Sequence, residues 1–132
     1  MKLTADTNIL VRALTGDDAR QSTRAQAELA NAELVALAMP ALCELVWVLS
    51  QGYKIPATEI AEAIRRLTNG TNVVANRPAV EAGLALLEAG GDFADGAIAH
   101  EGSWLGADVF LSFDRKAAKL LGAQGKSVRL LA

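Results

Sequence analysis

The sequence lacks the features that would place it in several common classes of protein. It has one cysteine in 132 residues, which excludes an intramolecular disulfide and favours a reducing compartment. Aromatic residues make up only 5% of the chain, so a core must be built mainly from Ala, Leu, Val and Ile. The net charge of -2 excludes the strongly basic surface of a protein that coats nucleic acid.

Long apolar segments are also absent. No apolar run reaches the roughly 20 residues that a membrane span requires. Asp6 interrupts the apolar start, where a secretory signal needs a continuous apolar stretch. Hydrophobic residues nevertheless make up 52% of the chain, enough for one buried core. We therefore expect a soluble cytoplasmic protein with a single domain, residues 1–132, and no contact with a membrane.

Short apolar strands alternate with helices along the whole chain. Strands are predicted over residues 2–5, 34–38, 71–75, 108–112 and 127–131. Helices are predicted over residues 8–14, from 17 to about 31, 40–51, 56–67, from 78 to about 90, from 92 to between 102 and 106, and 114–121. This alternation predicts an α/β protein, a three-layer α/β/α sandwich with a central, mostly parallel twisted sheet. In such sheets ligands bind beyond the carboxyl ends of the strands.

Two acidic residues follow predicted strands directly. Asp6 stands in Asp6-Thr7-Asn8 after the first strand, and Asp114 follows the fourth strand, two residues after Ser112. Each acid alone can be explained as the N-cap of the next helix. Both also fall on the edge of the sheet where ligands are expected.

Glu44 is harder to explain structurally. Its helix, residues 40–51, is apolar almost all round and is therefore predicted to be buried. No Lys or Arg lies three or four residues away to form a local ion pair. A buried carboxylate in that position needs a distant base, a raised pKa or a cation.

Asp92 and Asp95 form a pair in the segment GGDFADGAIAHEG, residues 90–102. Either acid can cap the following helix, but only one is needed for capping. Asp95 precedes the apolar segment 97–99, so we take it as the candidate site residue. Asp92 is then the cap of the helix, with a minor role in supporting the site. His100 falls on the opposite side of the helix and is interpreted as a structural or surface residue.

The four candidate acids make chemical sense together. Clustered carboxylates repel one another, so such a group is favoured mainly when a hard cation neutralises it. Carboxylate oxygens suit Mg²⁺ or Mn²⁺, and the chain has no Cys/His set for zinc.

The same segments resemble a known family. The stretches ADTNIL (5–10), PALCELVWVL (40–49), DFADGAIA (92–99) and LSFDRKAAKL (111–120) are similar in order and spacing to the motifs of PIN domains, in particular the VapC-type toxins of prokaryotic toxin–antitoxin pairs. The resemblance implies metal ligands in the order Asp6, Glu44, Asp95 and Asp114.

The resemblance also implies supporting residues. Asn8, with Thr7, would orient a carboxylate or the attacking water, and Ser112 stands where the family often has Thr. Gly96 stands where Ala is more usual, a departure that we expect to loosen the helix start slightly.

The activity implied by the resemblance is hydrolysis of an RNA phosphodiester with one or two Mg²⁺ or Mn²⁺ ions. It further implies a homodimer and inhibition by a cognate antitoxin. Arg12, Arg115 and Lys116 are the basic residues nearest in sequence for contacting the RNA. The sequence leaves open whether that RNA is transfer, ribosomal or messenger RNA.

Other α/β enzymes fit less well. A haloacid-dehalogenase phosphotransferase needs a second acid where Asn8 stands, and a receiver domain needs an acid where Asn76 follows the third strand. A Rossmann or P-loop module needs glycines after the first strand, and TADTNILVRAL has none. The alternatives that remain are a non-catalytic PIN-like binding or scaffold module and a PIN nuclease that processes RNA outside a toxin–antitoxin system.

Overall fold

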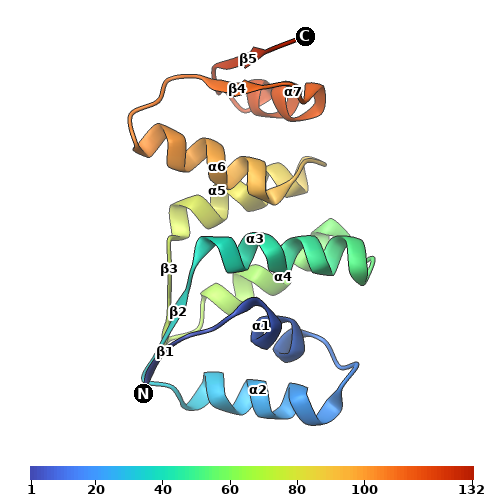
Figure 1. Cartoon of the computed structure of the whole chain (residues 1–132), viewed down its shortest axis with the longest axis vertical. Coiled ribbons are helices and arrows are strands. Elements are labelled where there is room, and N and C mark those ends of the chain that lie inside the picture. The colour runs from blue at the N-terminus through green and yellow to red at the C-terminus, as the bar shows by residue number, and fades with distance from the viewer. The chain divides into compact units, whose positions relative to one another are not determined.

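The computed structural model describes residues 1–132, which form two compact units, Met1–Asn76 and Arg77–Ala132. Seven α-helices, one π-helix and five strands follow one another in the alternation predicted from the sequence (Figure 1). All strand pairs are parallel, which confirms the mixed α/β prediction. The strands divide between two sheets, one in each unit. None of the helices combines the length and the apolar character needed to cross a membrane.

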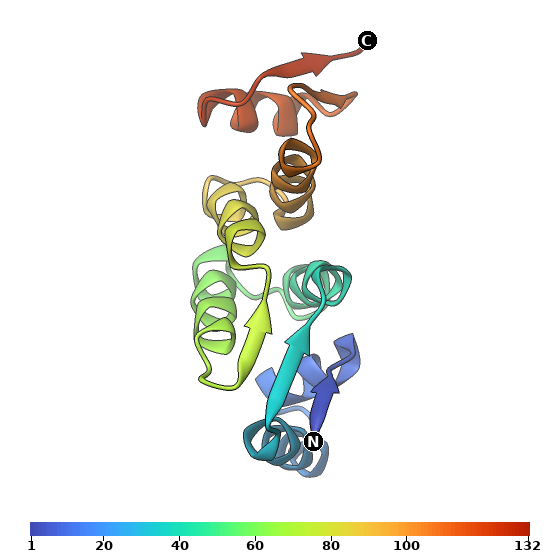
Figure 2. The same cartoon turned by 90° about the vertical axis from the view of Figure 1, so that its left-hand side faces the viewer.

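The first unit is built on a three-stranded parallel sheet. Its order is β1 (Lys2–Thr4), β2 (Leu34–Leu37) and β3 (Val73–Ala75), with Val35 of the central strand opposite both Leu3 and Val73. Figure 2 shows the three arrows running in the same direction. Their carboxyl ends therefore share one edge, where α1 (Thr7–Leu14) and α3 (Met39–Trp47) begin.

The remaining helices of this unit are α2 (Ala19–Asn31), the π-helix η1 (Val48–Gly52) and α4 (Ala57–Thr68). The π-helix continues α3, so the predicted helix 40–51 is present but changes its hydrogen-bond pattern near its end. The backbone N–H of Tyr53 closes it by donating to the Val48 carbonyl at 3.1 Å. Lys54 then turns the chain with a φ of 57°, a conformation that few residues with a side chain adopt.

The second unit contains α5 (Arg77–Glu88), α6 (Phe93–Trp104), β4 (Phe110–Ser112), α7 (Arg115–Ala123) and β5 (Val128–Leu130). β4 and β5 pair in parallel, with Leu111 opposite Arg129. A small core of Leu86, Ala99 and Leu121 joins α5, α6 and α7.

Glycines let α5 and α6 pack at very short distance. A Cβ on Gly96 would lie 2.5 Å from the Ala82 carbonyl oxygen, and a Cβ on Gly83 would lie 2.7 Å from the ring of Phe93. Phe93 is fully buried in this contact. Gly96 therefore has a steric role that the sequence did not reveal, because the lack of a side chain allows the two backbones to approach; that it loosens the helix start slightly stays a prediction.

Candidate active site

The first candidate acid lies directly after β1 and begins α1. An oxygen of the Asp6 carboxylate accepts a hydrogen bond from the backbone N–H of Ile9 at 3.0 Å, so Asp6 is the N-cap of this helix. Thr7 and Asn8 form the first turn behind it. Capping occupies one carboxylate oxygen and leaves the other available as a ligand. Asp6 can therefore cap α1 and also serve as a candidate metal ligand.

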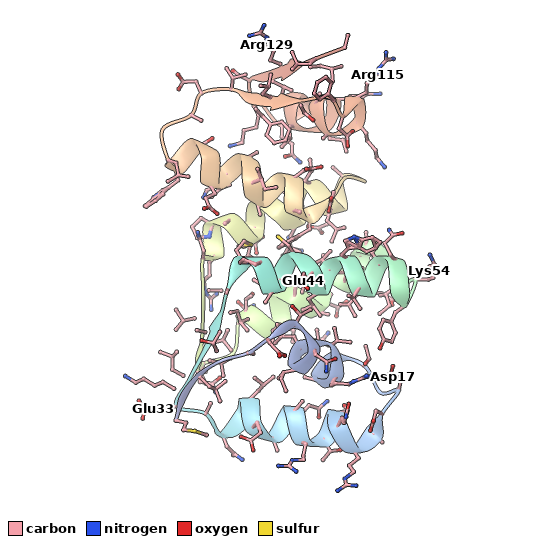
Figure 3. The ribbon with its side chains drawn as sticks, in the orientation of Figure 1. Asp17, Glu33, Glu44, Lys54, Arg115 and Arg129 are labelled. Atoms are coloured by element: carbon pink, nitrogen blue, oxygen red, sulfur yellow. The ribbon has the colours of Figure 1, made fainter.

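Glu44 lies in the middle of α3, where the structure corrects one expectation (Figure 3). Its side chain is exposed, and Trp47, one turn further on, is 61% exposed. The helix buries Leu42, Leu45 and Val46 on its other face. The prediction that Glu44 is buried was wrong because the apolar Trp47 belongs to the exposed face. Glu44 is therefore a candidate metal ligand because of its position in the motif, and not because burial removes water from its carboxylate.

The structure separates the roles of Asp92 and Asp95. Asp92 is the N-cap of α6, and one of its carboxylate oxygens accepts from the backbone N–H of Ala94 at 3.2 Å. Asp95 is the third residue of the helix, is half-buried and takes no part in this capping bond. Capping therefore explains Asp92 and not Asp95, which lies in the first turn, where the helix dipole favours an acid.

The electrostatic surroundings of Asp95 distinguish it from the other candidate acids. Its burial raises the pKa of the carboxyl above its ordinary value, and the neighbouring negative charges of Asp92 and Asp114 raise that pKa further. Asp92 and Asp114 are thus close enough to Asp95 for their charges to act on it, although the three carboxylates do not by themselves form a group that could hold a metal ion. A bound cation would relieve this repulsion, and the oxygen donors suit a hard divalent ion.

Asp114 begins α7 and is held at the end of β4. Its carboxylate accepts from the backbone N–H of Ala117 at 3.0 Å, and its own backbone N–H donates to the Ser112 hydroxyl oxygen at 2.9 Å. The Ser112 hydroxyl thus helps to fix the backbone of Asp114. Its hydroxyl hydrogen is still available to donate to a second group.

The four predicted ligands are divided evenly between the units. Asp6 and Glu44 belong to the first unit, and Asp95 and Asp114 belong to the second. Within either unit, no three acidic, histidine or cysteine side chains form a group that could hold a metal ion. His100, interpreted as structural or surface, is half-buried on α6.

The three basic residues proposed for RNA differ in their surroundings. A guanidinium nitrogen of Arg12, Nη1, lies 3.1 Å from an Asp17 carboxylate oxygen, so this charge is partly neutralised. Arg115 and Lys116 are exposed in the first turn of α7, directly after Asp114 (Figure 3). Arg115 and Lys116 are therefore more available to bind an anion than Arg12 is.

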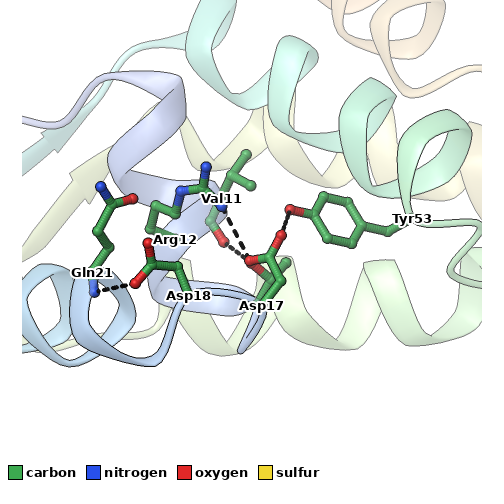
Figure 4. A network of polar contacts seen from close by, with 7 residues as sticks. Val11, Arg12, Asp17, Asp18, Gln21 and Tyr53 are labelled. Atoms are coloured by element: carbon green, nitrogen blue, oxygen red, sulfur yellow. Dashed lines mark hydrogen bonds and ion pairs between the residues drawn. The ribbon is translucent and has the colours of Figure 1, made fainter.

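Asp17 is a polar centre that the sequence did not reveal. It accepts hydrogen bonds from the Tyr53 hydroxyl at 2.6 Å, from the Thr15 hydroxyl at 2.9 Å and from Arg12 at 3.1 Å (Figure 4). These donors, Tyr53 first, lower the pKa of the Asp17 carboxyl. The sequence marked residues 16–18 only as a helix break, and no local signal pointed to Tyr53.

Comparison with known protein families relates the chain to a family of known domains. The family model described as PIN domain matches residues 4–121. No curated protein matches the chain. The matched region runs through both units and contains all four candidate acids.

Proposed function

The chain belongs to the PIN-domain family, and from this membership we propose that it is a metal-dependent endoribonuclease. PIN domains are generally nucleases that use divalent metal ions, which supports cleavage of a phosphodiester bond. The observation that carries the proposal is the family match together with the presence of all four acids of the resembling motifs. Because the match extends over both units, we treat residues 1–132 as one PIN-like domain.

The proposed ligands are Asp6, Glu44, Asp95 and Asp114, which would hold one or two Mg²⁺ or Mn²⁺ ions. The ion, when bound, activates water and offsets negative charge that develops on the phosphodiester. The chain supplies the ligands from fixed positions, because Asp6 and Asp114 are anchored as helix caps. The half-buried Asp95, repelled by its acidic neighbours, would be stabilised by the charge of the ion.

Further residues are proposed to support this chemistry. Asn8 and Thr7 would orient a carboxylate or the attacking water, and Ser112 would donate its free hydroxyl hydrogen. Arg115 and Lys116 would contact the RNA beside Asp114, with Arg12 in a lesser role because of its ion pair.

We also propose that the protein is the toxin of a toxin–antitoxin pair, acting in the cytoplasm as a homodimer held inactive by a cognate antitoxin. The similarity of the four motif segments to VapC-type toxins supports this part of the proposal. The single cysteine, Cys43, is compatible with a reducing compartment. A short neighbouring gene encoding a DNA-binding antitoxin would add further support.

The test is RNA cleavage by the purified chain, freed of any inhibitor, with Mg²⁺ or Mn²⁺ and with EDTA. Asp6→Asn and Asp114→Asn are well suited, because Asn is as good an N-cap as Asp and the fold is retained while a charged ligand is lost. Asp108→Asn, on an exposed residue before β4, is the matched control. We expect metal-dependent cleavage by the wild type and the control and its loss in the two site variants.

Two results would contradict the proposal. If the folded wild type cleaves no RNA with either metal, the chain is better described as a PIN-like binding or scaffold module. If Asp6→Asn and Asp114→Asn cleave as well as the control, the reaction takes place without the assigned ligands.

A further inference from the structure

A groove of about 710 Å³ lies between α1 and α2 in the first unit. Three arginines line it, Arg12 from α1 and Arg20 and Arg24 from α2. Asn8 and Gln21, whose side-chain amides can donate hydrogen bonds, line it as well. The groove is thus rich in donors for an anion.

The two arginines of α2 share the groove with two acids, Asp18 and Glu28, but form an ion pair with neither. Arg20 and Arg24 are one turn apart on the same helix, are exposed and form no ion pair. Like charges at this spacing on a helix repel each other. Asp18 caps α2 through the Gln21 N–H at 3.0 Å and keeps its negative charge, and Glu28 lies one turn after Arg24, so the groove holds three arginines and two acids. An anion bound between the two guanidinium groups would remove their repulsion.

Arg12 also lines the groove, but it is less available to a ligand than the two arginines of α2. Its Nη1 donates to Asp17, as Figure 4 shows, but its Nε is buried and has no hydrogen-bond partner. Buried donors in native proteins are nearly always satisfied, by protein, water or a bound group. Because this Nε is buried, it is not exposed to a ligand in the groove, and the proposal below rests on Arg20 and Arg24.

The position of the groove indicates which anion it takes. Asn8, on the groove wall, is two residues after Asp6, the first proposed metal ligand. An RNA strand whose scissile phosphate lay at Asp6 would carry its neighbouring phosphates past Asn8. Guanidinium groups suit phosphate because they can donate two parallel hydrogen bonds.

We propose that the α1–α2 groove is a subsite for the RNA backbone, in which Arg20 and Arg24 bind phosphates flanking the cleaved bond. This inference rests on the proposed ribonuclease function for the identity of the strand. The subsite positions RNA without taking part in the reaction, so its contribution is to binding.

The experiment measures binding separately from cleavage. A fluorescein-labelled single-stranded RNA is titrated with protein in EDTA, and its anisotropy gives Kd over a range of salt concentrations. The variant Arg20→Ala/Arg24→Ala is compared with Arg66→Ala/Arg129→Ala, which removes the same charge from exposed positions outside the groove. Equal thermal unfolding curves of the variants and the wild type establish that each is folded.

We expect the groove variant to bind RNA at least about tenfold more weakly, because charge-assisted hydrogen bonds are lost. The plot of log association constant against log salt concentration has a negative slope. Its magnitude should decrease by about 1.4, since each of the two lost phosphate contacts on a single strand contributes about 0.7. The control variant should show neither change. Equal RNA affinity of the two variants would overturn the proposal.

A parallel titration with a labelled poly-glutamate peptide separates RNA from an acidic protein partner. If the groove variant loses affinity for the peptide alone, the groove is a protein-contact surface and the RNA subsite is refuted. Cleavage by the wild type is scored in a separate assay with metal. A failure of the nuclease proposal is therefore distinguishable from a failure of the subsite.

Discussion

The hydroxyl of Tyr53 donates a hydrogen bond of 2.6 Å to the carboxylate of Asp17, although 36 residues separate them in the chain. The bond joins the loop before α2 to the residue that closes the π-helix. Thr15 and Arg12 donate to the same carboxylate, so the conformation of the loop is fixed from both sides (Figure 4). Arg12 also lines the groove between α1 and α2. Its hydrogen bond to Asp17 therefore helps to fix its position in the wall of that groove.

Removal of the Tyr53 hydroxyl should weaken this network. In Tyr53→Phe we expect the pKa of Asp17 to rise towards its ordinary value, because its principal hydrogen bond is lost. A carboxyl whose pKa is lowered by folding stabilises the fold above its unfolded pKa, about 3.9, and loses that contribution as the pH falls through the folded value. The variant should therefore unfold at a lower temperature than the wild type at pH 7, with a smaller difference near pH 3. NMR titration of the Asp17 carboxyl and thermal unfolding at both pH values measure the two effects; an unchanged pKa would contradict them.

Two glycines of α6 should respond oppositely to the same substitution. Gly96→Ala places a Cβ 2.5 Å from the Ala82 carbonyl oxygen, so we expect it to reduce the free energy of unfolding by about 1–3 kcal/mol. A Cβ at Gly102 meets nothing within 4 Å, so Gly102→Ala should add about 0.4–1 kcal/mol by restricting the unfolded chain. Denaturant unfolding of both variants tests the pair. Similar stabilities of the two would show that α5 and α6 do not pack as closely as the structure has them.

Substitutions of Asp92 and of Asp95 should affect different properties, the first mainly stability and the second mainly cleavage. Asp92→Ala removes an N-cap and should cost about 1 kcal/mol of stability, while retaining more cleavage than Asp95→Asn does. Asp95→Asn should abolish cleavage and, in EDTA at pH 7, raise the unfolding temperature, because it removes a half-buried charge beside two other acids. Addition of Mg²⁺ or Mn²⁺ should raise the unfolding temperature of the wild type but not of Asp95→Asn. Full cleavage by Asp95→Asn together with its loss in Asp92→Ala would reverse the assignment.

Glu44 should matter for activity and not for stability. Its side chain is exposed, so Glu44→Gln should change the free energy of unfolding by less than about 0.5 kcal/mol. As a proposed direct ligand, it should lower the cleavage rate by more than the roughly 10- to 100-fold expected for residues that only support a ligand. Glu59→Gln, on an exposed acid in the first turn of α4, is the control; it should leave cleavage unchanged and lower the free energy of unfolding by no more than about 1 kcal/mol, because a favourable interaction with the helix N-terminus is lost. Cleavage by Glu44→Gln at the rate of the control would remove Glu44 from the site.

Local chemistry along the chain determined the elements and their beginnings. The alternation of apolar strands with capped helices predicted every helix and strand to within a few residues, because caps, prolines and apolar periodicity act over one or two turns. The capping explanations for Asp6, Asp92 and Asp114 are confirmed for the same reason. Their roles as ligands stay predictions, drawn from the motifs.

Tertiary structure decided what depends on residues far apart in the sequence. It placed Glu44 on an exposed face, although the composition of its helix predicted burial, because the packing of neighbouring elements selects which face is covered. It gave Gly96 a steric role through the carbonyl of Ala82, and it joined Tyr53 to Asp17. Such contacts are set by how helices and strands pack after they form, and no pattern within a single segment can specify them.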